Sequence, residues 1–131
     1  GAESMVPTTT SAASELAKVL PDLAKRTTVA AVRVPSLSVS AIDAIVQLKA
    51  PLPASADNLL QDIAGRSSVI GATQDACVSR DLRARPESLI LALPETMVLD
   101  ETQIRIFGWY DNEWGFSARM IEMARRMATR S

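Results

Sequence analysis

The chain has 131 residues, a formal net charge of −1 and 47% hydrophobic residues. This length suits one domain with its own core, and the apolar content excludes a disordered segment. The two signs of charge are interspersed and no apolar run could span a bilayer, so we expect neither a nucleic-acid partner nor a membrane partner. We therefore treat residues 1–131 as a single domain.

The residue types that the chain lacks limit its chemistry. It has no histidine and only one cysteine, Cys77. A Cys/His nucleophilic pair cannot be built from these residues, a zinc site is not expected, and no internal disulfide can form. One cysteine is typical of a reducing compartment, so we expect a cytoplasmic location. The glycines are too scattered to form a phosphate loop of the G-x-G-x-x-G or Walker type.

Apolar residues at helical spacing predict helices, and runs rich in β-branched residues predict strands. A turn is expected over 7–11. Helices or helical turns are expected to begin near Ser11, at Pro21, after Ser55, and after Asp111 or Asn112. The first should end near Leu20, before Pro21, and Gly65 is well placed to end the third. Strands are expected over 29–34, 38–48, 69–72, 76–80, 88–93 and 102–110.

The connections between these strands indicate the fold class. Most gaps between strands after Gly65 are too short for a helical crossover. We therefore predict an α+β fold with a mostly antiparallel or mixed sheet covered by helices. In the last helix Met120, Met123 and Met127 fall on one face, which is typical of a packing surface.

Several segments resemble one enzyme family. Nine residues nearly match the W-Y-D-N-E-x-G-[YF]-S segment of the glyceraldehyde-3-phosphate dehydrogenase family: Trp109-Tyr110-Asp111-Asn112-Glu113-Trp114-Gly115-Phe116-Ser117. Val32-Arg33-Val34-Pro35 resembles the family's F-R-V-P. Residues 39–43 resemble V-S-V-V-D, and residues 2–13 resemble A-x-N-I-I-P-T-S-T-G-A-A. The resemblance covers essentially the whole chain and corresponds to roughly the last two-fifths of a family member.

The resemblance implies a glyceraldehyde-3-phosphate dehydrogenase-like C-terminal domain. Members oxidise a sugar-phosphate aldehyde with NAD or NADP and inorganic phosphate, and they assemble as tetramers. In the family, the dinucleotide-binding domain, the nucleophilic cysteine and the base histidine precede the region that this chain resembles. We therefore expect the isolated chain to be inactive, to bind no cofactor tightly and to self-associate. Cys77 aligns with an ordinary strand residue and is not the nucleophile.

The resemblance assigns a phosphate-binding role to Thr10, Ser11 and Arg33. A helix N-terminus and a guanidinium both favour anions, which suits that role. The structural alternative is a capped helix and a salt-bridged arginine. The chain departs from the family pattern here, because Ser11 replaces a glycine and Ser14 replaces a lysine.

The resemblance assigns a cofactor-binding role to Asn112 and Phe116. An asparagine amide can both donate to and accept from the carboxamide of nicotinamide. Phe116 keeps the ring of the tyrosine that members often carry near the nicotinamide. The structural alternatives are a helix cap for Asn112 and core packing for Phe116.

Two alternatives stay open. Residues 41–43 and 113–116 are closer to the erythrose-4-phosphate dehydrogenase branch, whereas Tyr110 is more usual in glyceraldehyde-3-phosphate dehydrogenases. The chain could also be a non-catalytic interaction or oligomerisation module on the same fold. Ser11 and Ser14 favour the module, while Arg33 and Asn112 favour the enzyme because folding alone requires neither. The choice between NAD and NADP is equally open.

Overall fold

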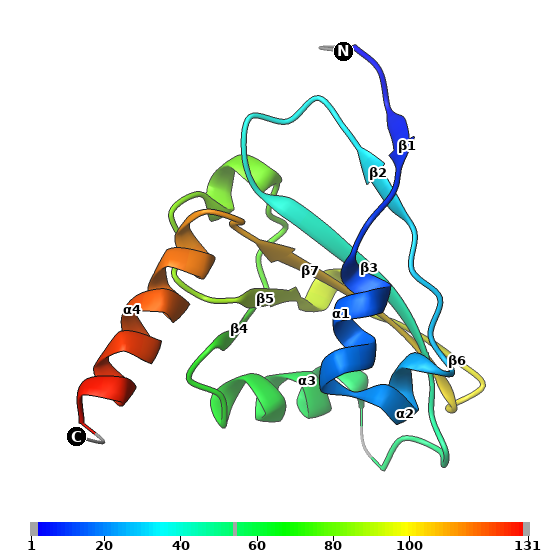
Figure 1. Cartoon of the computed structure of the whole chain (residues 1–131). Helices are drawn as coiled ribbons and strands as arrows, with labels where there is room; N and C mark the ends of the chain where they lie inside the picture. Colours follow the sequence, from blue (N-terminus) through cyan, green and yellow to red (C-terminus); the bar gives the residue numbers. More distant parts are fainter. Residues whose placement is uncertain (1–2, 54, 130–131) are drawn as a thin grey trace. The chain divides into compact units, whose positions relative to one another are not determined.

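The structure is a computed structural model that describes residues 3–53 and 55–129 (Figure 1). Ala2, the first residue of one family-like segment, lies outside these ranges. The chain divides into two compact units, Gly1–Leu37 and Ser38–Ser131. The assignment of residues 1–131 to one domain stays a prediction.

The smaller unit combines a two-stranded ladder with two short helices. Strand β1 (Val6–Thr8) pairs antiparallel with β2 (Ala31–Arg33). Helix α1 (Ala12–Val19) ends before α2 (Pro21–Ala24), as Pro21 predicts, because proline lacks the N–H that a continuous helix needs. The turn expected over 7–11 is wrong in its first residues, which belong to β1. The strand expected over 29–34 is shorter than predicted.

The larger unit is built on a mixed sheet. Its strands are β3 (Ser40–Gln47), β4 (Ile70–Thr73), β5 (Leu89–Ala92), β6 (Met97–Leu99) and β7 (Gln103–Tyr110). The order is β3-β7-β5-β4, and β6 also pairs with β7. The helices are α3 (Ala56–Gly65), η1 (Ser79–Leu82), η2 (Leu93–Glu95) and α4 (Trp114–Ala128). This architecture confirms the predicted α+β class.

The central strand β7 has both edges paired, one with β3 and the other with β5 and β6. Ile104 on this strand is 2% exposed and packs in a core with Ala56 and Leu60 of α3. The Ser55 side chain accepts a hydrogen bond from the Asn58 N–H, so it caps α3 as predicted. One core cluster therefore lies between α3 and one face of the sheet. A second cluster, formed by Val39, Leu82 and Ile90 with Trp109 packed against it, lies on the other face.

Two details of the larger unit differ from the sequence-based expectations, and a third makes the sheet mixed, as the predicted fold class allows. The strand expected over 76–80 is absent; Asp81 instead accepts a hydrogen bond from the Val78 N–H and closes the η1 turn. Strand β6 was not predicted. The β4–β5 pair is parallel, because the connection between its strands is long enough for a crossover.

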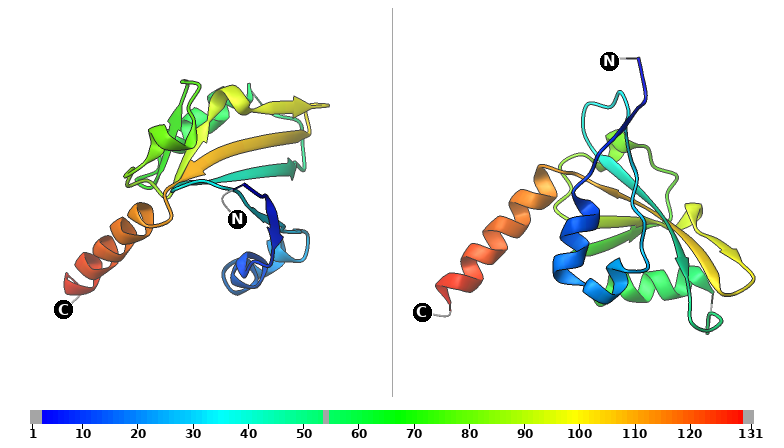
Figure 2. Two further views of the ribbon diagram at one scale, coloured as in Figure 1. Left: turned by 90° about the horizontal axis from the view of Figure 1, so that it is seen from above. Right: turned by 45° about the vertical axis from the view of Figure 1, so that its right-hand side comes forward.

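Helix α4 extends away from the sheet, as both views in Figure 2 show. Gly115 is its only buried residue, and Met120, Met123 and Met127 are all more than half exposed. The methionine face thus has little cover within this unit. Within residues 3–53 and 55–129, no helix combines the length and apolar character needed to cross a membrane.

Gly108 on β7 provides a test of this packing. A Cβ atom built there would lie 2.7 Å from Leu89 Cδ1 and 3.1 Å from the Ile90 carbonyl oxygen. We expect Gly108→Ala to lower the free energy of unfolding by about 1–3 kcal/mol through overpacking. Gly65→Ala is the control, because no atom lies within 4 Å of the added Cβ. Urea denaturation compares the two, and equal stabilities would contradict this packing.

Candidate functional site

A short turn between β7 and α4 holds the one buried charged side chain among the described residues, Asp111, which is 8% exposed. Its Oδ1 accepts hydrogen bonds from the N–H groups of Glu113 at 3.1 Å and Trp114 at 2.9 Å. Its Oδ2 accepts from the Ala84 N–H at 2.9 Å. The backbone N–H groups of Trp114 and Ala84 are the main reason that the pKa of Asp111 lies below its ordinary value. Of the two predicted caps, Asp111 is the one whose side chain bonds to the first N–H of α4, although Glu113 occupies the N-cap position.

Asn112 and Phe116 share one cavity at this turn. The cavity has a volume of about 300 Å³ and is lined by Ser88, Tyr110, Asp111, Asn112, Gly115, Phe116 and Arg119. Both Asn112 and Phe116 are exposed. The Asn112 side-chain amide makes no hydrogen bond to any residue that the structure describes, so its donor and acceptor are available to a ligand.

The segment before β5 forms one wall of this cavity. Arg119 donates from one terminal nitrogen to the Pro86 carbonyl oxygen at 3.3 Å and to Ser88 Oγ at 3.1 Å. A Cβ atom at Gly115 would lie only 2.8 Å from the Glu87 carbonyl oxygen, so a glycine is needed for this close approach. The sequence analysis did not identify Ser88 or Arg119, because their contact joins positions 31 residues apart and leaves no periodic signal.

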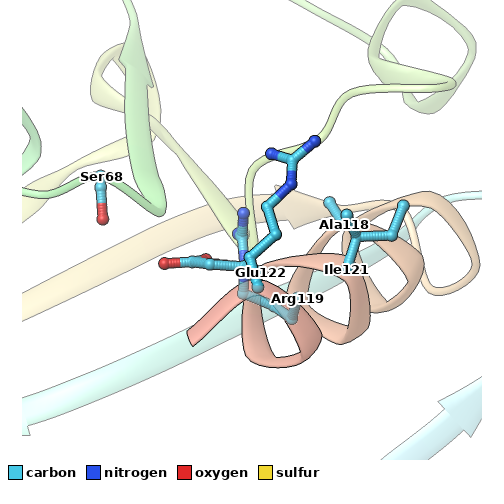
Figure 3. A pocket seen from close by; sticks show the side chains of 6 residues that line it. Ser68, Ala118, Arg119, Ile121 and Glu122 are labelled. Atoms are coloured by element: carbon cyan, nitrogen blue, oxygen red, sulfur yellow. The ribbon is translucent and has the colours of Figure 1, made fainter. Parts of the chain in front are cut away.

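A wider cavity of about 420 Å³ lies further along α4 (Figure 3). It is lined by Ser68, Ala118, Arg119, Ile121, Glu122 and Arg125. Arg119 Nε lies 3.0 Å from Glu122 Oε2, so part of its charge is neutralised within the helix. None of the predicted site residues lines this cavity.

The three predicted phosphate ligands all belong to the smaller unit and are exposed. Thr10 Oγ1 accepts a hydrogen bond from the Ala12 N–H at 3.1 Å, so it caps the start of α1. Ser11 occupies the N-cap position but makes no side-chain capping bond. Arg33 makes no ion pair with any described residue.

The register of the β1–β2 ladder defines the position of Arg33 relative to the start of α1. Arg33 pairs with Val6, whereas Thr8, which is nearer to α1, pairs with Ala31. The four residue-to-residue steps from Val6 to Thr10 span at most about 14 Å. A phosphate shared by Thr10 and Arg33 therefore requires the arginine side chain to extend along the ladder toward α1.

Comparison with known proteins identifies the family. The family model described as glyceraldehyde 3-phosphate dehydrogenase, C-terminal domain, matches residues 1–112. The chain belongs to this family. The family resemblance and the fold class predicted from the sequence are thus confirmed.

The described residues contain no group of three or more His, Cys, Asp or Glu side chains that could hold a metal ion.

Curated relatives match nearly the whole chain. Glyceraldehyde-3-phosphate dehydrogenase 3 of a Nostoc species is 38% identical over 129 residues, which cover 95% of this chain and 38% of the relative. Glyceraldehyde-3-phosphate dehydrogenase 2 of Bacillus subtilis is 37% identical over 131 residues, covering 98% and 38%. The protein of that name in Staphylococcus aureus is 36% identical over 125 residues, covering 95% and 37%. The chain thus spans about two-fifths of the length of these relatives.

The buried Asp111 carboxylate should make stability depend on acid pH. Its pKa is lower in the folded chain than in the unfolded chain, so its stabilising effect is complete at neutral pH. That effect should be lost as the pH falls below about 4 and through the folded-state pKa. Asp111→Asn should lower the free energy of unfolding at pH 7 by about 1–3 kcal/mol and flatten this acid dependence.

Urea denaturation between pH 7 and pH 3 measures both effects. Asp75→Asn is the control, because Asp75 is exposed. An unchanged acid dependence in Asp111→Asn would show that the carboxylate does not stabilise the folded state.

Proposed function

We propose that this chain is part of the catalytic domain of an NAD(P)-dependent dehydrogenase that oxidises a sugar-phosphate aldehyde, with glyceraldehyde 3-phosphate as the first candidate substrate. Family membership supports this function. The observation that carries it is the shared cavity of Asn112 and Phe116, two residues that sequence reasoning selected independently of the cavity. The base histidine that the family resemblance implies would have to come from outside these residues, because the chain has no histidine.

The residues at this cavity fit a nicotinamide ring. The Asn112 amide carries both a donor and an acceptor, and the complementary groups of a carboxamide can pair with it. Phe116 adds an exposed aromatic ring to the same cavity wall, which is suited to contact with a flat heterocycle. When bound, the nicotinamide would accept a hydride from the substrate, and the role of Asn112 is to fix the orientation of the ring.

Substitution of Asn112 tests this function in the complete protein that contains the chain. Asn112→Ala should lower kcat/KM for the nicotinamide cofactor by about tenfold or more, since one lost hydrogen bond is worth about 1–2 kcal/mol. Asn58→Ala on the exposed surface of α3 is the matched control and should leave kcat/KM unchanged. Assays with glyceraldehyde 3-phosphate and erythrose 4-phosphate, each with NAD and NADP, identify the preferred pair.

Two results of that assay would contradict the proposal. One is a complete protein that oxidises neither aldehyde, which would favour a non-catalytic module. The other is equal kcat/KM for wild type and Asn112→Ala. The isolated chain should form no NADH with either aldehyde.

We also propose that Thr10, Ser11 and Arg33 bind phosphate in the complete enzyme. The N-terminus of α1 presents backbone N–H groups, and Arg33 supplies a charge that no described residue neutralises. The capping bond at Thr10 leaves its hydroxyl able to donate to an anion.

Phosphate titration of the chain, followed by NMR, tests this anion site. We expect the amides of residues 10–13 to shift, with a dissociation constant on the order of millimolar. Arg33→Ala should abolish the shifts, while Arg83→Ala, which removes another exposed arginine, should not. If phosphate shifts none of these amides, Thr10 is only a helix cap and the assignment fails.

The sheet face opposite the α3 core supports a proposal of self-association, as expected of a homo-oligomer. Paired residues in a ladder share a face, so Ile45 and Met97 lie on the same side as Arg105, with which both pair. Ile45 and Met97 are 71% and 60% exposed, and Asp43 neutralises Arg105 through two hydrogen bonds. An apolar face with a neutralised charge is typical of an interface.

Light scattering tests this interface. Wild type should form oligomers, and Ile45→Lys should weaken the association by about tenfold or more, because it places a charge in the apolar face. Ile63→Lys on α3 is the control, since Ile63 is also partly exposed but belongs to a different surface. A monomeric wild type at high concentration would contradict the proposal.

A further inference from the structure

No hydrogen bond to a described residue determines where the Asn112 amide points. It is exposed, and its side chain forms no hydrogen bond with any described residue. Its direction therefore depends on the backbone between the end of β7 and the first turn of α4. Asp111, its immediate neighbour, holds that backbone through its buried carboxylate.

We propose that Asp111 is a positioning residue that sets the direction of the Asn112 side chain by joining the first turn of α4 to the turn at Ala84. The inference rests on the proposed contact between Asn112 and nicotinamide. Asp111 itself is not a catalytic residue, because both of its oxygens are occupied by backbone N–H groups.

The two carboxylate oxygens of Asp111 bond to different parts of the chain, one nearby and one distant in sequence. Oδ1 accepts from the Glu113 and Trp114 N–H groups, which is local helix capping and follows from the sequence nearby. Oδ2 accepts from the N–H of Ala84, which lies 27 residues earlier in the chain. This second bond stops the cap from turning freely relative to the rest of the unit.

The residue that donates this bond, Ala84, has an unusual backbone conformation. Ala84 has a φ of 60°, a left-handed conformation that is uncommon for a residue with a side chain. Such strain persists only where surrounding contacts hold it. The bond to Asp111 is one such contact. A glycine at position 84 would adopt this φ without strain, but the chain has an alanine there.

Two further contacts hold the same segments together. Arg119 donates to the Pro86 carbonyl oxygen and to Ser88 Oγ, and Gly115 approaches the Glu87 backbone closely. The segment 84–88 is therefore held at Asp111, which precedes Asn112, and at Gly115 and Arg119, which follow it. Loss of the Ala84 bond would free the end nearest to Asn112 while the Arg119 contact still holds the helix.

Two variants separate the cap from the Ala84 bond. Asp111→Asn keeps the size of the side chain and removes its charge. Asp111→Ser keeps a hydroxyl that can cap α4 but is too short to reach the Ala84 N–H as well. The second variant keeps the test valid if the first does not fold. Asp62→Asn is the matched control, because it removes a carboxylate from an exposed ion pair with Arg66 on α3.

NMR of the 131-residue chain supplies the direct readout. In wild type we expect slow hydrogen exchange at the Ala84 amide and three-bond HN–Hα couplings that report a single backbone φ for Asn112, because the backbone sets the direction of its Cα–Cβ bond. In both Asp111 variants the exchange should accelerate by about tenfold or more and the couplings should become averaged, whereas Asp62→Asn should match wild type. A folded Asp111→Ser chain that keeps the wild-type Asn112 couplings would overturn the proposal.

Hydride transfer from a deuterated aldehyde in the complete protein tests the consequence. Wild type should place deuterium on one face of C4 of the reduced nicotinamide, and both Asp111→Ser and Asn112→Ala should place part of it on the other face. A change in stability alone would not alter this ratio. Full selectivity in Asp111→Ser together with lost selectivity in Asn112→Ala would overturn the positioning role. Full selectivity in Asn112→Ala would instead refute the proposed contact with nicotinamide, and the Asn112 couplings would still decide whether Asp111 positions it.

Discussion

The buried carboxylate of Asp111 connects the end of the central strand β7, the first turn of α4 and the turn at Ala84. A carboxylate without partners would be costly at this depth, since charged groups lose their hydration on burial. Three backbone N–H donors replace that hydration, and charge-assisted bonds of this kind are each worth about 1.5–3 kcal/mol. The same carboxylate belongs to a residue that lines the cavity of Asn112 and Phe116.

The contacts around this carboxylate hold the junction between β7 and α4 in one conformation. Helix α4 buries only Gly115, so packing along its length does little to fix it within this unit. Its position depends instead on contacts within its first two turns, from the Asp111 cap to the Arg119 bonds with Pro86 and Ser88. The methionine side chains of α4 are more than half exposed within this unit.

The sequence predicted the features that depend on neighbouring residues. Pro21 ends α1, Ser55 caps α3, and Asp111 precedes α4, because each effect acts within a few residues of its cause. The family motif likewise selected Asn112 and Phe116, which line the same cavity. The roles of these residues, and of Thr10, Ser11 and Arg33, stay proposals.

The features that the sequence did not predict depend on distant contacts. The segment over 76–80 has strand-like composition, yet the Asp81 side chain turns it into η1. Strand β6 is short and exposed, and only its pairing with β7 makes it a strand. The Asp111–Ala84 and Arg119–Ser88 bonds join positions 27 and 31 residues apart, so no local pattern reveals them.

A crystal structure of the complete protein with a bound nicotinamide cofactor tests the central claim most directly. The account predicts that the Asn112 amide lies within hydrogen-bonding distance, about 3 Å, of the nicotinamide carboxamide, with the Asp111 carboxylate still bonded to the Ala84 N–H. A cofactor bound with its nicotinamide ring outside the cavity of Asn112 and Phe116 would contradict it.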